Sequence, residues 1–184
     1  MLKWFGYDKN EVLAFNDKRI CGLWFLIIGV TIALGTAFGG DMMINPFILG
    51  IGYGVGMVFS FNPIVAKKLS LGPSSSFQNK MATLAIVAMF VLMFFIAGPF
   101  FSSENFRMTW LGTLLAVGLH FFIFYFVHGK SMIYIGVLCS LCAVLGMVLT
   151  GVPFVFFGVA DGVIKVSFGA YLLFFSKPTT SRAV

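Results

Sequence analysis

Charged residues are scarce in this 184-residue chain: only 10% of its residues are Asp, Glu, Lys or Arg, and only six are acidic. A water-soluble domain of this length needs far more polar surface to cover its core. Hydrophobic residues make up 60% of the chain, and 24 residues are Phe. This composition excludes a soluble globular protein and indicates a protein that is surrounded by lipid.

Cysteine and histidine are also rare, with three and two residues, and their positions lack the spacings that are typical of metal sites. Phosphate-binding glycine loops, serine nucleophile elbows and paired catalytic carboxylates do not occur either. We therefore expect no enzymatic activity, no metal and no cofactor. Cys139 and Cys142 form a C-x-x-C pair inside an apolar stretch, and we interpret them as small packing residues, with a redox pair as the alternative.

Six apolar stretches are long enough to cross about 30 Å of hydrocarbon as helices. The strict alternation of a membrane barrel strand does not occur, and backbone groups in lipid must find partners within their own segment. The sequence therefore predicts an all-α integral membrane protein with a single bundle of six transmembrane helices. The predicted spans are Ile20 to Phe38, Met43 to Ala66, Met81 to Phe101, Met108 to His128, Met132 to Gly151 and Val152 to Phe175.

Basic residues are distributed unequally between the two sides of this predicted bundle. Ten of them fall on the side of both termini, whereas the opposite connections carry only Arg107, and Lys165 lies inside the last span. This positive-inside bias predicts that the N-terminus and the C-terminus are cytoplasmic. The ten residues are Lys3, Lys9, Lys18, Arg19, Lys67, Lys68, Lys80, Lys130, Lys177 and Arg182.

The same pattern divides the chain into a cytoplasmic or interfacial segment at 1–19, the transmembrane domain at 20–175 and a cytoplasmic tail at 176–184. We expect a multi-pass protein of the plasma membrane. Its net charge of +6 suits contact with anionic headgroups, so the expected partner is the lipid bilayer and not nucleic acid. A homo-oligomer or a larger membrane partner is a further expectation.

Small residues recur every fourth position in three spans, a spacing that lets helix backbones approach one another. We predict helix packing at Gly29, Ala33, Ala37, Gly52, Gly56, Ser60, Gly158 and Gly162. Asn45-Pro46 is typical of a helix start. Asn62-Pro63 instead predicts a kink or a helix end, and the freed backbone carbonyl beside Asn62 makes this residue a candidate for a polar cavity.

Two charges stand inside the last span, where an ionisable group costs about 2.5 to 3.5 kcal/mol. Asp161 and Lys165 are four residues apart and therefore share one helical face. Helical rise places them about 14 and 20 Å from the predicted outer end, and His120 of the fourth span about 18 Å. We predict a buried ion or proton site formed by Asp161, Lys165 and His120. Protonation would shift the last helix against the fourth and second spans. A structural pair that fixes helix register is the alternative.

The segment Asp161-Gly-Val-Ile-Lys165-Val-Ser-Phe168-Gly169 resembles the last helix of microbial rhodopsins over about one span. There an Asp precedes by four residues the Lys that binds retinal. The resemblance implies retinal on Lys165 with Asp161 as its counter-ion, although those proteins have seven helices. The number of spans is also similar to the substrate-binding subunits of energy-coupling-factor vitamin transporters. Their small-residue motif corresponds to Ala33 and Ala37, but their long first outer loop has no counterpart here.

These observations lead to one functional expectation with two alternatives. We expect a polytopic membrane protein with a buried polar site, acting as a transport-related or small-ligand-binding component. A structural or accessory membrane subunit would use the small-residue stripes and short loops instead. The resemblance to rhodopsins implies a retinal-binding photoreceptor-like protein through Lys165.

Overall fold

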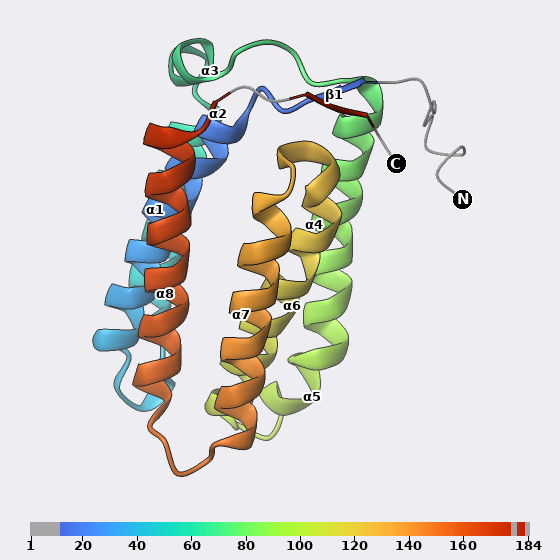
Figure 1. Ribbon diagram of the computed structural model, residues 1–184. Coiled ribbons are helices and arrows are strands. Elements are labelled where there is room, and N and C mark those ends of the chain that lie inside the picture. Colours follow the sequence, from blue (N-terminus) through green and yellow to red (C-terminus); the bar gives the residue numbers. More distant parts are fainter. Residues whose placement is uncertain (1–11, 178–179, 183–184) are drawn as a thin grey trace.

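The computed structural model describes residues 12–177 and 180–182 and consists almost entirely of helices (Figure 1). One short antiparallel ribbon, β1 with β2, pairs Leu13 with Ser181 near the two termini. In chain order the elements are β1 (Val12–Ala14), α1 (Lys18–Ala37), η2 (Gly40–Met42), α2 (Pro46–Phe61), α3 (Pro63–Leu69), α4 (Ser76–Ile96), α5 (Gly98–Phe101), α6 (Phe106–His128), α7 (Ser131–Val148), α8 (Phe154–Ala170), the π-helical turn η3 (Tyr171–Phe175) and β2 (Thr180–Arg182).

Five helical spans are long and apolar enough to cross a membrane, and a sixth results if α2 and α3 count as one bent span. The helical character predicted from the sequence is confirmed, but the second predicted span is not one helix. Its axis turns by 64° between Phe61 and Pro63, where the Asn62 side chain accepts hydrogen bonds from the backbone of Ile64 (2.8 Å) and Val65 (3.4 Å). The predicted break at Asn62-Pro63 is confirmed.

Local capping chemistry explains where two other helices begin. The Asn45 side chain accepts from the amides of Phe47 (3.0 Å) and Ile48 (3.2 Å), so the predicted start at Asn45-Pro46 is confirmed. Helix α4 begins at Ser76, five residues before the predicted Met81, because Ser75 and Gln78 form a reciprocal capping box. Hydropathy alone did not predict this start, because the first turn of α4 is polar. At its other end α4 stops at Ile96, before the short helix α5.

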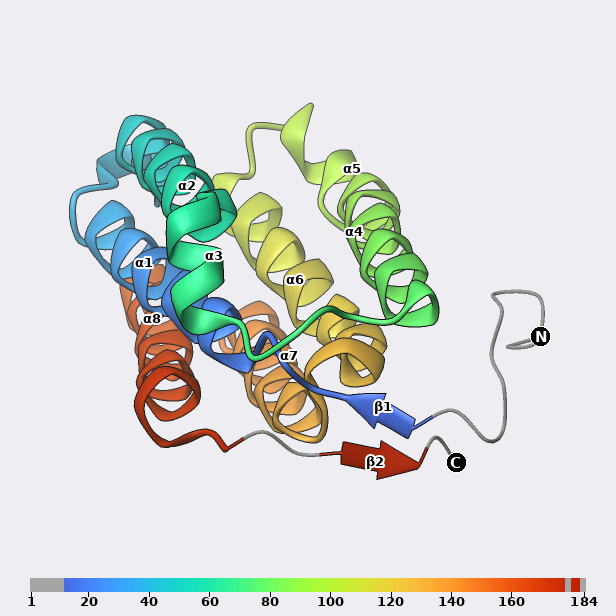
Figure 2. The same cartoon turned by 90° about the horizontal axis from the view of Figure 1, so that it is seen from above.

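The helices form two neighbouring groups (Figures 1 and 2). Helix α1 packs against α8 and α2, while α6 packs against α7 and α4. The two groups meet along α7 and α8 and through a shared core in which Ile28 and Ile32 of α1 lie against Leu114 of α6 and Ala143 of α7. The shape is therefore a bundle whose centre is bounded by α1, α6, α7 and α8.

The closest backbone contact in this bundle is between α1 and α8. A Cβ added at Gly29 would lie 2.6 Å from the carbonyl oxygen of Gly162, and one added at Gly22 would lie 2.8 Å from that of Gly169. Any side chain at these positions would force the helices apart. Glycine at both crossings therefore fixes the distance and rotation of α8 against α1.

Large apolar side chains cover the outside of the bundle. Phe47, Phe61, Phe94 and Phe175 are each more than 70% exposed, and exposed Val, Ile and Leu residues lie on the spanning helices around them. Continuous apolar surface of this kind is rare on soluble monomers and is expected where helices face lipid tails.

Basic residues gather at one end of the bundle, which is at the top of Figure 1. Of the ten residues counted on that side, Lys3 and Lys9 lie outside the described residues, as does most of the expected interfacial segment at 1–19. The other eight belong to the start of α1, to α3, to the N-terminal part of α4, to the connection before α7, to the segment that follows η3 and to β2. Arg107 lies at the opposite end, in the first turn of α6.

Candidate functional site

Asp161 and Lys165 lie on the buried face of α8. Their exposed fractions are 0% and 1%, and the Lys165 ammonium donates a hydrogen bond to Asp161 Oδ2 to form a buried ion pair. This is the only ion pair between side chains in the described part of the chain. Helical rise places Asp161 about 10 Å and Lys165 about 16 Å from the start of the 22-residue span Phe154–Phe175, so Lys165 is near its middle.

The rotation of α8 puts these charges inside. Gly158 and Gly162 face α1, where Thr36 and Gly29 are their neighbours. Asp161 lies between the two glycines and directly precedes Gly162. Because α8 cannot rotate without opening these glycine contacts, the pair stays on the side that faces the bundle. Helix α8 makes most of its contacts with α1 and then with α7. Our expectation that it packs against the second and fourth spans was therefore wrong.

Polar partners around the pair are few. Lys165 Nζ lies 3.8 Å from Cys139 Sγ on α7, and Cys142 Sγ donates to the Phe157 carbonyl over 3.4 Å. Tyr53 of α2 lies close enough to interact electrostatically with both charges. Asp161 Oδ1 is buried and has no hydrogen bond of ordinary geometry from a described group, and the thiol of Cys139 is the polar group of α7 that lies next to the carboxylate. One carboxylate oxygen is thus committed to Lys165, and the other has no donor of ordinary hydrogen-bond geometry among the described groups.

His120 is buried in α6, with an exposed fraction of 7%. Its Nδ1 donates a hydrogen bond to the carbonyl of Val117. The ring is tilted against that of Phe121, at 4.4 Å between centroids, and meets that of Phe124 edge-on at 5.3 Å. No hydrogen bond joins it to Asp161 or Lys165 within the described residues. Lys165 acts on it electrostatically, so His120 is a neighbour of the pair and not a direct partner.

Asn62 does not join this centre. Its side-chain oxygen is occupied as the cap of α3, and it follows Tyr53 by nine residues, or about 13 Å of helical rise. The polar-cavity interpretation of Asn62 is therefore replaced by its role at the bend.

The predicted packing residues fall mostly at helix contacts. Gly29, Ala33, Gly158 and Gly162 lie between α1 and α8, and Gly52 and Gly56 lie against Thr31 and Trp24 of α1. Ser60 is buried, whereas Ala37 is exposed at the last position of α1. The prediction omitted Gly22 and Gly169, which complete the α1–α8 contact seven residues from Gly29 and Gly162.

A small cavity of about 30 Å³ is lined in part by Tyr53, the residue of α2 that interacts electrostatically with Asp161 and Lys165. Its volume suits one or two water molecules. The lining residues come from α1, α2, α6 and the connection before α2: Ile32, Ile44, Leu49, Tyr53, Trp110, Thr113, Leu114 and Val117. Lys165 is not among its lining residues.

Arg107 has a role that the sequence analysis missed. Its guanidinium donates to the carbonyls of Gly146 (2.7 Å), Leu149 (3.1 Å) and Val152 (2.9 Å). These carbonyls lie at the end of α7 and in the connection to α8, where a cation satisfies free acceptors and offsets the helix dipole. Arg107 therefore holds the end of α7 next to the start of α8, the helix that carries the pair.

Comparison with known protein families matches residues 8–182 to a family of unknown function (DUF6609). The comparisons with curated proteins and with solved structures give no match. The family match covers the whole helical bundle, including both charged residues of α8.

Proposed function

The chain belongs to the DUF6609 family, and we propose that it is a plasma-membrane transport or small-ligand-binding protein whose working centre is the pair Asp161–Lys165. In this proposal Asp161 takes up and releases a proton, and Lys165 supplies the compensating charge. Both termini are cytoplasmic, as the distribution of basic residues predicts.

The observation that carries this proposal is the partly satisfied carboxylate. A purely structural pair gains most when each oxygen and each proton of the two groups has a partner. Here Asp161 Oδ1 has no partner of ordinary hydrogen-bond geometry in the described part of the chain, and the further contact of Lys165 Nζ is the weak acceptor Cys139 Sγ. Ionisable groups held inside a membrane bundle in this way are typical of ion and proton pathways.

Charge balance indicates what accompanies the proton. The pair is neutral as Asp⁻ with Lys⁺, so protonating Asp161 leaves a lone ammonium in a medium where an uncompensated charge is costly. A small anion that replaces the carboxylate beside Lys165 restores neutrality. The proposal is therefore coupled movement or binding of one proton and one anionic group. The associated shift involves α8 against α1 and α7, its main neighbours.

Proton uptake into liposomes tests the proposal. The purified protein is reconstituted with an entrapped pH-sensitive dye, and chloride or sulfate gradients are applied as anionic probes. Uptake is expected for the wild type and absent for Asp161→Asn. Asp41→Asn is the matched control, because it makes the same chemical change at an exposed residue of η2. Equal uptake by the wild type and Asp161→Asn would reject the proposal.

An accessory membrane subunit is a second candidate, favoured by one feature of α2. Gly50 and Gly54 have no atom within 4 Å of an added Cβ, and Phe47 and Ile51 beside them are exposed. Small residues four apart on an open face suit packing against another membrane helix. This candidate predicts that Gly54→Leu abolishes co-purification of a membrane partner or a second copy, whereas Asp161→Asn has no effect.

The retinal alternative has a simple test of its own. Added retinal would give a visible absorption band in the wild type, and this band would be lost in Lys165→Ala. A spectrum that is the same with and without the protein would remove this alternative.

A further inference from the structure

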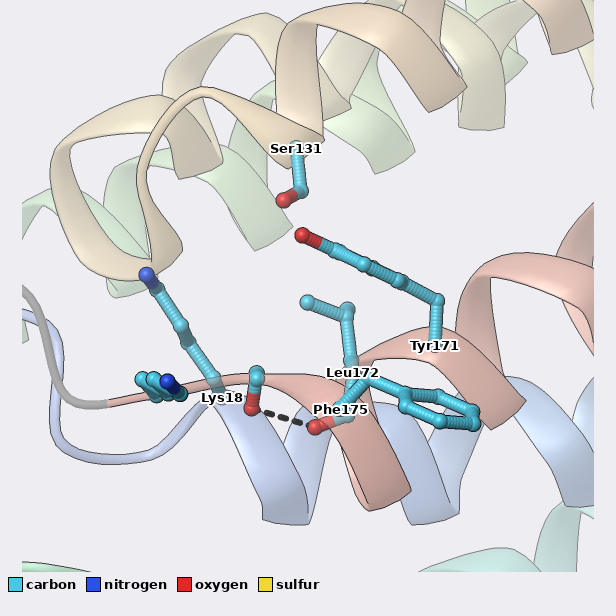
Figure 3. Close-up of a pocket in the computed structure, with 7 residues that line it drawn as sticks. Lys18, Ser131, Tyr171, Leu172 and Phe175 are labelled. Atoms are coloured by element: carbon cyan, nitrogen blue, oxygen red, sulfur yellow. Dashed lines mark hydrogen bonds between the residues drawn. The ribbon is translucent and has the colours of Figure 1, made fainter.

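We propose that a pocket at the basic end of the bundle binds a phosphate-bearing anion, for which an anionic phospholipid headgroup and a soluble phosphate ester are the two sources. The pocket has a volume of about 220 Å³ and lies between the start of α1, the start of α7 and η3 (Figure 3). It is independent of the centre on α8. Its lining residues are Lys18, Ser131, Tyr171, Leu172, Phe175, Ser176 and Lys177.

Positive charge dominates this pocket. Two of its lining residues are lysines and none is acidic. Lys18 also lies over the ring of Phe15, at 5.3 Å from the ring centroid. The nearest carboxylate along the chain is Asp17, and its two oxygens accept from the hydroxyls of Ser70 (2.6 Å) and Ser74 (2.8 Å). Asp17 therefore contacts the α3–α4 connection, and it is not one of the lining residues.

Hydroxyl groups complete the donor set. Ser131 and Tyr171 point their hydroxyls toward one another across the pocket (Figure 3), and neither makes a hydrogen bond to another described residue. Ser131 is the first residue of the 18-residue helix α7, which has neither a side-chain cap nor an acidic residue in its first turn. The partial positive charge of this helix start adds to that of the lysines.

Neutralisation of the α8–η3 carboxyl end is a simpler reason for two lysines here. It does not account for two hydroxyls facing one space or for the pocket itself. A volume of about 220 Å³ is smaller than the range of drug-sized sites, which begins at about 300 Å³, and suits a headgroup. Tyr171 and Phe175 are 53% and 73% exposed, so an acyl chain can continue along η3 into the surrounding lipid. This continuity favours the lipid as the source.

Thermal unfolding of the full-length protein in neutral detergent tests this inference. The ligands are short-chain phosphatidylglycerol, short-chain phosphatidylcholine as the zwitterionic comparison, and glycerol phosphate as the soluble source. The expected result is saturable stabilisation by phosphatidylglycerol. Lys177→Gln should weaken its binding about fivefold, and Tyr171→Phe should weaken it by a similar factor. Lys68→Gln, which removes the same charge from α3 at the same end, should leave binding unchanged.

Each result decides a separate question. Binding of glycerol phosphate with the same dependence on Lys177 and Tyr171 would support the site and identify the soluble ester as its source. Equal stabilisation by both lipids without any effect of glycerol phosphate would overturn the inference, as would equal losses for Lys68→Gln and Lys177→Gln. Wild-type binding by Tyr171→Phe, which removes one oxygen atom and leaves the packing, would also overturn it. Asp161→Asn should bind normally, so failure here is distinct from failure of the proposed function.

Discussion

Removing one or both members of the Asp161–Lys165 pair should have markedly non-additive effects on stability. Lys165→Met leaves a carboxyl of 0% exposure without its cation, and Asp161→Asn leaves an ammonium whose nearest other partner is the sulfur of Cys139 at 3.8 Å. Breaking a buried pair from one side costs about 3–5 kcal/mol, whereas replacing both partners by neutral groups of similar volume is close to neutral. The double variant should therefore be no less stable than either single variant.

The free energy of unfolding is measured by titrating SDS into mixed micelles and following far-UV circular dichroism. Two single losses of about 3 kcal/mol, with a double variant near 3 or less, give a coupling of at least about 3 kcal/mol. Losses that add to within about 0.5 kcal/mol would refute the reasoning, because they would show that the two side chains do not interact. Asp41→Asn should unfold as the wild type does.

The same variants separate a structural pair from a working one. If the pair only fixes the register of α8, the double variant should recover function together with stability. We expect the opposite: Asp161→Asn combined with Lys165→Met should fold and should remain inactive in the proton-uptake assay.

Three further predictions follow from the fold. Gly29→Ala should lower the free energy of unfolding by about 1–3 kcal/mol in the same SDS titration, because its Cβ would lie 2.6 Å from a carbonyl oxygen of α8. Gly54→Ala, at an open position of α2, should leave the free energy of unfolding unchanged or raise it by about 0.5–1 kcal/mol. Equal losses of stability in Gly29→Ala and Gly54→Ala would contradict the close contact between α1 and α8. Arg107→Gln should lower the free energy of unfolding by about 2–3 kcal/mol and raise hydrogen exchange at the end of α7. Arg107→Lys should lie in between, because the single nitrogen of lysine cannot reproduce the spread of the two guanidinium nitrogens that reach the three carbonyls. Hydrogen exchange of Arg107→Gln at the wild-type rate would contradict this prediction. Single cysteines at Ser103 and Ser74 should react with an impermeant maleimide from opposite sides of intact cells, Ser103→Cys from outside, and labelling of both from one side would contradict the proposed topology.

Sequence patterns were informative where one short segment determines the outcome. The spacing of four residues places Asp161 and Lys165 on one helical face, and Asn-Pro at 45–46 and 62–63 gives a start and a break at the observed residues. Hydropathy was sufficient to predict the apolar helical segments, of which the second is bent into α2 and α3. The helix start at Ser76 was missed because a capping box of polar residues opens an apolar helix.

Features that depend on distant segments could not be read from the sequence. Cys139 and Tyr53 approach the pair only because α7 and α2 pack around it, and nothing in their local sequence gives that position. The main neighbour of α8 is α1, at the other end of the chain. Gly22 lies against Gly169 and Gly29 against Gly162, and these pairs are apparent only when the two helices are known to be in contact. The ribbon between β1 and β2 joins the two ends of the described chain in the same way.

Infrared spectroscopy of protein labelled with ¹³C-carboxyl aspartate tests the central claim most directly. The chain contains four aspartates, so subtracting the spectra of Asp161→Asn from those of the wild type isolates one carboxyl group. With chloride or sulfate present, lowering the pH of the folded protein in membranes should produce a protonated carboxyl band from Asp161 that reverses when the pH is raised. A carboxylate band from Asp161 that stays constant over the whole range in which the protein remains folded would contradict proton exchange at this residue.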